Sequence, residues 1–242
     1  MLLRVLLLSA LLVQGALAET SEVQEAIMAL KSGNTKTAVK TLENSCKAGN
    51  QESCSLLGEL YLLGWGVDRD LDRAYKLLSK SCTAGIAEGC NEIGLMYQEG
   101  IKFKRDFSKA AEYFRKACNL NSFGQGLGCY NYGNIYFFGR GVTPDFQKAL
   151  QLFLKACNLG AALGCNNAGV IYEKGLTAKK DLKKAIDFYS KACHTENIEG
   201  KKVGCYNLGR LLYRRKDEGF KKEAVNYLTL SCNLGYQPAC DE

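Results

Sequence analysis

Residues 90–100 read CNEIGLMYQEG, and variants of this stretch recur along the chain. Each copy opens with a cysteine and has a glycine four residues later; the copies begin at Cys54, Cys90, Cys129, Cys165 and Cys205. The apolar spacing is that of a helix, in which a glycine costs about 1 kcal/mol relative to alanine. A glycine that returns at one place in every copy therefore predicts close contact with a neighbouring helix. In four copies a tyrosine follows three residues later on the same face, and we expect it to pack in the core.

A second helix is predicted after each copy. Four copies end in a glycine, which suits the left-handed residue that closes a helix. Six residues later an aspartate precedes another apolar-periodic segment, such as FSKAAEYFRKAC at residues 107–118. An aspartate there accepts hydrogen bonds from unpaired backbone amides, and this capping explains its position better than catalysis does. These aspartates are Asp70, Asp106, Asp145 and Asp181.

The repeating unit is therefore a helix (A), a turn and a second helix (B). One pair cannot bury its own apolar face, but stacked pairs share a continuous core. We predict an all-α fold, a right-handed superhelix of about six helix pairs that forms a single solenoid over residues 19–242, with a short disulfide-tied C-terminal tail. The loops at residues 119–128 and 194–204 are enlarged. We expect them to project from one edge as variable contacts, the alternative being simple tolerated insertion.

Twelve cysteines occur in the chain, two at each junction between repeats. The first of each pair ends a helix B, and the second opens the next helix A. An antiparallel turn brings these positions within the roughly 4.4–6.8 Å that a disulfide needs, whereas partners one repeat away would be displaced by a whole helix pair. The predicted disulfides are Cys46–Cys54, Cys82–Cys90, Cys118–Cys129, Cys157–Cys165, Cys193–Cys205 and Cys232–Cys240.

The cysteine pattern also bears on metals and on the compartment. No CxxC occurs and His194 is the only histidine, so we predict neither a metal site nor a cofactor. A disulfide framework instead indicates an oxidising compartment.

Residues 1–18 have the features of a secretory signal peptide. Arg4 precedes a short leucine-rich run at residues 5–13, and residues 16–18 read ALA, a small-x-small cleavage signal. The run is shorter than the roughly 20 residues of a membrane-spanning helix, so an uncleaved anchor is the less favoured alternative. Cleavage near Ala18–Glu19 would give a secreted or periplasmic protein without stable membrane insertion.

The mature chain would be mildly basic. Removal of the signal peptide takes away Arg4 and no acidic residue, so the formal net charge falls from +7 to +6. The lysines are scattered along the helices, which favours a solvated surface over a nucleic-acid interface. We expect a monomer that does not bind nucleic acid.

Motifs for catalysis are scarce. With His194 as the lone histidine, a histidine-rich zinc hydrolase is excluded, and neither a GxSxG elbow nor a glycine-rich phosphate loop occurs. If all thiols are oxidised, no cysteine remains as a nucleophile. The SxxK motif of serine β-lactamases is absent, and the KSG triplet at residues 31–33 lies at a helix-to-helix turn and not on a strand. We therefore assign no catalytic residues.

The helix A pattern, the capping aspartate and the K-[AS]-C ending of helix B together resemble the Sel1-like repeat, a relative of the tetratricopeptide repeat. With a cysteine pair in every repeat and a signal peptide, residues 34–240 resemble the Helicobacter cysteine-rich proteins. The last repeat departs from the pattern, because Leu212 replaces the tyrosine and Phe220 is shifted by one position. We expect this repeat to cap the solenoid.

Polar side chains recur near the start of the A helices, which line the concave face of such solenoids. Asparagine offers both a donor and an acceptor, so it can bind a peptide backbone whatever the peptide's side chains are. The alternative is that these residues only occupy solvated helix starts. The candidate ligand-binding residues are Tyr130, Asn131, Asn134, Asn166, Asn167, Tyr206 and Asn207.

The resemblance implies a secreted protein that binds penicillin and slowly hydrolyses penicillin and cephalosporin derivatives. It also implies partners among host proteins and cell-wall fragments. Two functions therefore stay open. The first is a scaffold whose concave face binds a peptide, a peptidoglycan fragment or a β-lactam, and the second is a weak β-lactamase.

Overall fold

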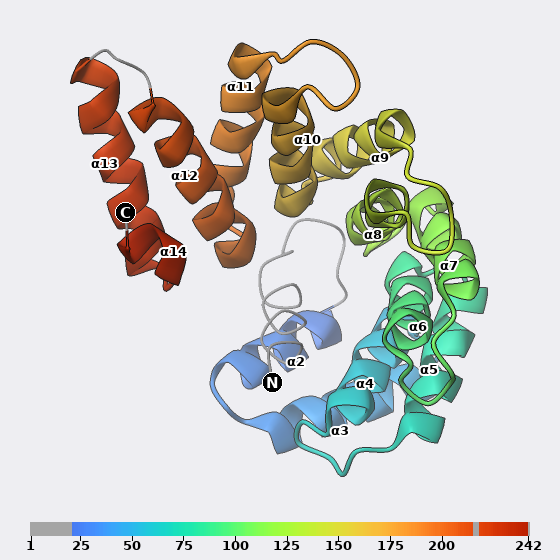
Figure 1. Cartoon of the computed structure of the whole chain (residues 1–242). Coiled ribbons are helices and arrows are strands. Elements are labelled where there is room, and N and C mark those ends of the chain that lie inside the picture. Colours follow the sequence, from blue (N-terminus) through green and yellow to red (C-terminus); the bar gives the residue numbers. More distant parts are fainter. Residues whose placement is uncertain (1–20, 215–217, 242) are drawn as a thin grey trace. The chain divides into compact units, whose positions relative to one another are not determined.

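The computed structural model describes residues 21–214 and 218–241, so the predicted signal peptide and its cleavage site lie outside the described residues. All regular secondary structure in these residues is helical, which confirms the all-α class (Figure 1). The helices are α2 (Ser21–Lys31), α3 (Thr35–Lys47), α4 (Gln51–Leu63), α5 (Leu71–Thr83), α6 (Ala87–Glu99), α7 (Phe107–Asn119), α8 (Gln125–Phe138), α9 (Phe146–Asn158), α10 (Ala162–Lys174), α11 (Leu182–Cys193), α12 (Ile198–Tyr213), α13 (Glu218–Asn233) and α14 (Gln237–Cys240).

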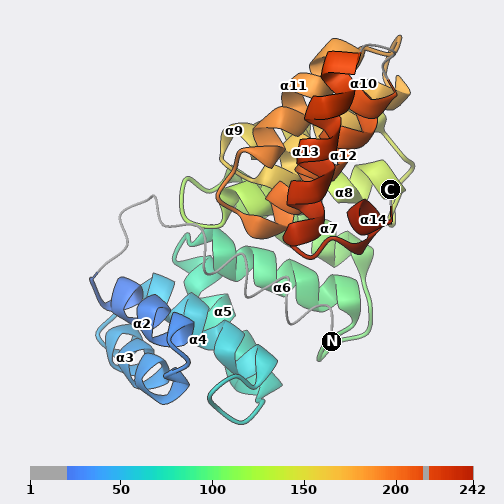
Figure 2. The same ribbon diagram turned by 90° about the vertical axis from the view of Figure 1, so that its left-hand side faces the viewer.

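The helices belong to two compact units, unit 1 ending at Pro144 and unit 2 beginning at Asp145. Even-numbered helices α2 to α12 are the predicted A helices, and odd-numbered helices α3 to α13 are the B helices. In unit 1, α4 and α5 lie side by side as an antiparallel pair, and in unit 2 α12 and α13 do the same (Figures 1 and 2). Helix pairs thus stack within each unit, as the repeat predicts, and the boundary between the units falls between α8 and α9, the A and B helices of one repeat.

The recurring glycine lies where a B helix presses on an A helix. A Cβ atom added to Gly94 of α6 would lie 2.5 Å from Cε1 of Phe114 in α7. The same addition at Gly169 of α10 would lie 2.6 Å from Cε1 of Tyr189 in α11. Both rings are fully buried, so the ring fills the space that the glycine leaves. The predicted close contact is confirmed.

The helix ends also follow the sequence prediction. Asp106 Oδ1 accepts a hydrogen bond from the Lys109 backbone amide at 2.9 Å, and Asp70, Asp145 and Asp181 cap α5, α9 and α11 in the same way. Gly100 ends α6 with φ 71°, a left-handed conformation that favours glycine. Helix capping therefore explains why an aspartate recurs at this position of the repeat.

One disulfide closes each junction between a B helix and the next A helix, as predicted. The bonded pairs have Cα–Cα distances of 4.4–4.9 Å, and no described cysteine is free. Six disulfides indicate an oxidising, extracytoplasmic environment. Within residues 21–214 and 218–241, no helix is both long and apolar enough to cross a membrane. The disulfides are Cys46–Cys54, Cys82–Cys90, Cys118–Cys129, Cys157–Cys165, Cys193–Cys205 and Cys232–Cys240.

The two enlarged loops are shorter than predicted, because residues 125–128 and 198–204 are helical. The remaining loop in unit 1 folds back onto α6 instead of projecting. Ser122 Oγ accepts a hydrogen bond from the Ala87 amide at 2.8 Å, and the Phe123 carbonyl accepts one from the Glu88 amide at 2.9 Å. The N-cap residue of α6, Ile86, has no side chain that can do this. The insertion therefore caps a helix that lacks its own cap.

We predict that Ser122→Ala lowers the free energy of unfolding by about 1–2 kcal/mol, the usual cost of losing an N-cap. The hydroxyl also donates to the Gly85 carbonyl at 2.8 Å, so the change leaves two backbone groups without a partner. Urea unfolding measures the effect. Ser108→Ala, at an exposed position of α7, serves as the control and should change little.

Candidate functional site

The A helices form the inner row of each stack. Within unit 1, α6 packs on α8, and within unit 2, α10 packs on α12, whereas neighbouring B helices share at most marginal contacts in the described residues. A stack curves toward the row whose members lie closer together. We call the following side chains on this row the A face: in unit 1 Glu59, Glu88, Asn91, Glu92, Asn131 and Asn134, and in unit 2 Asn166, Asn167, Glu173, Asn207, Arg210 and Arg214.

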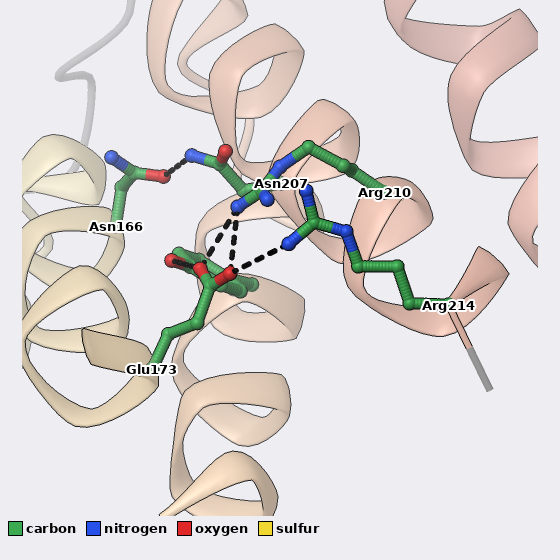
Figure 3. Close-up of polar contacts among 6 residues, drawn as sticks. Asn166, Glu173, Asn207, Arg210 and Arg214 are labelled. Carbon is green, nitrogen blue, oxygen red and sulfur yellow. Dashed lines mark hydrogen bonds and ion pairs between the residues drawn. The ribbon is translucent and has the colours of Figure 1, made fainter. Parts of the chain in front are cut away.

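In unit 2, predicted asparagines from successive repeats bond to one another (Figure 3). Asn207 Nδ2 of α12 donates to Asn166 Oδ1 of α10 at 2.8 Å, and Asn166 Nδ2 donates to Asn167 Oδ1 at 3.2 Å. A carboxamide has two N–H donors and an oxygen with two lone pairs. Asn207 makes one side-chain hydrogen bond among the described residues, so this half-buried carboxamide keeps hydrogen-bonding capacity.

Two arginines meet one carboxylate beside these asparagines. Arg210 Nη2 lies 2.9 Å from both oxygens of Glu173, and Arg214 Nη1 lies 3.7 Å from Oε1 (Figure 3). The Tyr189 hydroxyl donates to Glu173 Oε2 at 2.6 Å. Burial, followed by this hydrogen bond and the Glu173 charge, raises the pKa of Tyr189, so the hydroxyl stays a donor. With two cations to one anion, this part of the A face is electropositive.

The sequence prediction missed Glu173, Arg210 and Arg214. Helical spacing from the predicted asparagines could have identified them. Arg210 follows Asn207 by three residues on α12, and Arg214, at the end of that helix, follows it by seven. Residues at these spacings share a helix face. Glu173 follows Asn166 by seven residues on α10. The asparagines and the charged residues therefore form one strip across two A helices.

In unit 1 a similar chain of amides runs from α8 to α6. Asn131 Nδ2 donates to Asn91 Oδ1 at 2.8 Å, and Asn91 Nδ2 donates to Glu92 Oε1 at 3.3 Å. Asn91 and Glu92 were not among the predicted residues. Both are buried, in contrast to the half-buried Asn131.

Glu92 belongs to a cluster of three buried carboxylates with Glu59 of α4 and Glu88 of α6. One oxygen of each residue lies within 4.8 Å of the other two. Burial raises the pKa of Glu88 to about 7, opposed by a hydrogen bond with Glu59. Burial and then the charges of Glu92 and Glu88 raise the pKa of Glu59 well above its usual range. Burial and the Glu88 charge do the same for Glu92. The cluster is therefore more stable when its carboxylates are protonated or bind a cation.

The remaining predicted residues take up different places. Asn134 is buried on α8 and makes a hydrogen bond to Tyr130 that opposes the burial-driven rise in the Tyr130 pKa. Tyr206 of α12 packs its ring 5.1 Å from that of Tyr236, which precedes α14. The structure thus groups Tyr130 with Asn134 in unit 1 and the asparagines of unit 2 with each other, while Tyr206 packs against the C-terminal segment.

Within the described residues, neither the cysteines nor the serine beside the single histidine is arranged as an activated nucleophile. All the described cysteines form disulfides. His194 Nδ1 lies 2.8 Å from the Ser190 carbonyl oxygen and 3.3 Å from its Oγ. A carbonyl only accepts, so Nδ1 must carry the proton and cannot take one from the Ser190 hydroxyl. This exposed pair is not a catalytic dyad.

The repeat family follows from the sequence match. The Sel1 repeat model matches residues 51–86, 87–122, 126–160, 162–194 and 203–236, which together make up more than half of the chain. The chain is a Sel1 repeat protein. No curated protein shows significant similarity to this Sel1 repeat protein.

Solved structures support the same fold. A Sel1 repeat protein from Oxalobacter formigenes has 22% identity and a TM-score of 0.74, with 89% of this chain and 86% of that chain covered. A putative Sel1 repeat protein from Klebsiella pneumoniae has 17% identity and a TM-score of 0.57, with coverages of 84% and 96%. The structural neighbours of this Sel1 repeat protein include Helicobacter pylori cysteine rich protein B, with 30% identity, a TM-score of 0.43 and coverages of 52% and 94%.

Proposed function

We propose that this Sel1 repeat protein is an extracytoplasmic scaffold whose A face binds an extended peptide that carries a free carboxylate. The observation that carries the proposal is the strip on unit 2, where Asn166 and Asn207 lie beside two arginines that share Glu173. A peptidoglycan stem peptide has this chemistry, with peptide bonds and free carboxylates. It is the first ligand to test.

The asparagines suit the backbone of such a ligand. An amide side chain can donate to a peptide carbonyl and accept from a peptide N–H, so it binds the main chain without selecting side chains. Asn207 already makes a bond of this kind to Asn166 at 2.8 Å. Because that bond fixes the two carboxamides before binding, a ligand does not have to order them.

The arginines suit the carboxylate. Arg210 is bound to both oxygens of Glu173 and has a side chain only 20% exposed, whereas Arg214 is 64% exposed and lies 3.7 Å from Glu173. Planar guanidinium groups bind carboxylates through two parallel hydrogen bonds. Arg214 is thus placed to bind a second carboxylate, while Arg210 stays with Glu173.

The disulfides support a binding role by limiting motion. A solenoid has contacts only between neighbouring repeats, so its binding face is stiff only if each junction is stiff. A disulfide at every junction restrains the position of each A helix relative to the preceding B helix. Binding to a face held in this way costs less conformational entropy.

The test uses a fluorescent stem pentapeptide and measures anisotropy with the oxidised protein. Asn166→Ala, Asn167→Ala and Asn207→Ala together, all in unit 2, should weaken binding at least about tenfold, because each hydrogen bond contributes roughly 0.5–1.5 kcal/mol. Asn158→Ala, at the exposed end of α9, is the control and should bind like the wild type. Unchanged affinity of the triple variant would remove the A face as the binding site.

The other ligands that the family resemblance implies are tested in the same assay by competition. Benzylpenicillin has a carboxylate and an amide, so displacement of the peptide by it would indicate a shared site. Under the same proposal, a host protein binds the A face if it presents an extended segment. If neither the pentapeptide nor benzylpenicillin binds, the proposal for this ligand class is wrong.

The alternative function, a weak β-lactamase, makes a different prediction. The SxxK motif is absent from the sequence, the described cysteines are all in disulfides, and Ser190 beside His194 does not form a catalytic dyad. We therefore expect no sustained turnover of a chromogenic cephalosporin by protein free of contaminants. Multiple turnovers that a single point substitution abolishes would instead support the enzyme.

A further inference from the structure

Three carboxylates from two neighbouring A helices converge inside unit 1. Glu59 comes from α4, and Glu88 and Glu92 come from one turn of α6. Glu59 is 1% exposed, Glu88 4% and Glu92 0%. One oxygen of each lies within 4.8 Å of the other two. Charged carboxylates are rarely buried without a partner of opposite charge.

Few hydrogen-bond donors reach these carboxylates. Both oxygens of Glu59, Oε2 of Glu88 and Oε2 of Glu92 are buried, and no other group of the described residues donates a hydrogen bond to them. Glu59 and Glu88 can bond to each other only by sharing a proton. Asn91 Nδ2 reaches Glu92 Oε1 at 3.3 Å. The charged neighbours that affect Glu59 are Glu92 and Glu88, which are both acidic. An uncompensated group of this kind is costly, so the arrangement points to a bound species that supplies positive charge.

We propose that Glu59, Glu88 and Glu92 bind one hard divalent cation, with calcium as the best fit. All three donors are carboxylate oxygens, which favour calcium, magnesium and manganese over zinc and copper. Oxygens on opposite sides of a calcium ion lie about 4.6–5.2 Å apart, against about 4.0–4.2 Å for magnesium. The three oxygens lie within 4.8 Å of one another, so one ion of either kind can reach all of them. Calcium is the better fit because three carboxylates offer six oxygens, the lower limit for calcium, whereas magnesium usually keeps several waters and is bound through only one or two carboxylates.

The loop insertion forms one wall of this site. The Glu88 amide donates to the Phe123 carbonyl at 2.9 Å, which fixes the first turn of α6. Gly124 then packs so closely that an added Cβ atom would lie 2.3 Å from Glu88 Oε2. Asn91 orients Glu92 and is itself held by Asn131 of α8. Two of the three carboxylates are thus positioned by parts of the chain outside α6.

The experiment uses the oxidised chain after treatment with EDTA. Thermal unfolding and calorimetric titration are measured with calcium, magnesium and manganese chloride. The concentrations reach about 10 mM, well above the roughly 10⁻⁴–10⁻³ M dissociation constants of extracellular calcium modules. We expect one ion per chain and a melting temperature several degrees higher with calcium, since an ion that binds only the folded state stabilises it.

Two variants test the residues. Glu59→Gln and Glu92→Gln keep the side-chain shape, remove a buried charge and should weaken calcium binding at least about tenfold. Both variants should fold, and in EDTA they should melt at a higher temperature than the wild type, because less like charge is buried. Glu99→Gln, at the exposed end of α6, is the matched control and should bind calcium like the wild type.

Three outcomes would overturn the proposal. In the first, no ion raises the melting temperature. In the second, calorimetry detects no binding. In the third, both variants respond to calcium as the wild type does. In the first two cases the carboxylates hold shared protons only. No peptide is present in these measurements, so their result is independent of the proposed function.

Discussion

Replacing Gly94 with alanine should destabilise unit 1 by about 2–4 kcal/mol, toward the upper end of what overpacking a core usually costs. The new methyl group would lie 2.5 and 2.6 Å from Cε1 and Cδ1 of Phe114. Phe114 is fully buried, so its ring cannot relieve the contact by turning out into solvent. The helix-propensity gain of about 1 kcal/mol for alanine over glycine does not offset this clash. Urea unfolding of the oxidised protein measures the loss.

A double-mutant cycle separates the clash from other effects. Phe114→Leu removes the ring atoms nearest to Gly94, so Gly94→Ala should cost less in that background, with a coupling energy of about 1–2 kcal/mol. Gly58→Ala is the matched control in the preceding repeat. There the new methyl would lie 2.8 Å from Cγ of Leu78, a more flexible side chain, and the loss should be smaller. Additive costs in the cycle would contradict the proposed contact.

Without bound metal, the carboxylate cluster should make the protein less stable as the pH rises from about 4.5 to about 7. Burial raises the folded-state pKa of Glu88 to about 7, against the ordinary value of 4.5. A raised folded-state pKa means that the folded chain holds a proton which the unfolded chain has lost, so stability falls across this interval. For Glu88 the loss is on the order of 3 kcal/mol. Urea midpoints at pH 4.5 and pH 7.5 in EDTA measure it.

Comparison with a variant isolates the cluster from the other carboxylates. Asp181, for example, has a lowered pKa because it accepts the Lys184 amide as a helix cap, so its effect on stability has the opposite sign. Glu88→Gln should be more stable than the wild type at pH 7.5 and should differ little from it at pH 4.5. If the two proteins respond to pH in parallel, the three carboxylates do not titrate as described. Calcium should reduce the wild-type loss if the ion binds there.

Much of the fold could be read from short segments of sequence. Asp106 caps α7 through the Lys109 amide three residues away, and Gly100 closes α6. The cysteines of a junction are eight to twelve residues apart, so a single turn brings them together. Even the contact of Gly94 with Phe114 follows from the repeat, because the glycine recurs in every copy. These features depend on local geometry and on a period.

The candidate site was predicted only in part. Asn131 and Asn207 were chosen because they recur two residues after a cysteine. Their partners, Asn91 and Asn166, lie forty and forty-one residues earlier in the chain. The charged residues Glu173, Arg210 and Glu59 each occur once at their place in the repeat, so comparison of the repeats does not mark them, and only helical spacing from the asparagines points to Glu173 and Arg210. The loop at residues 119–128 was predicted to project, whereas its serine caps α6.

The sequence by itself determined the helix pairs, their caps and the disulfide at every junction, because each of these depends on residues a turn or a loop apart. Only the tertiary structure decided which side chains of neighbouring A helices meet. That choice depends on the register between helices about forty residues apart, which packing sets. Glu59 therefore meets Glu88 and Glu92, and Arg210 meets Glu173, through contacts that no local pattern specifies.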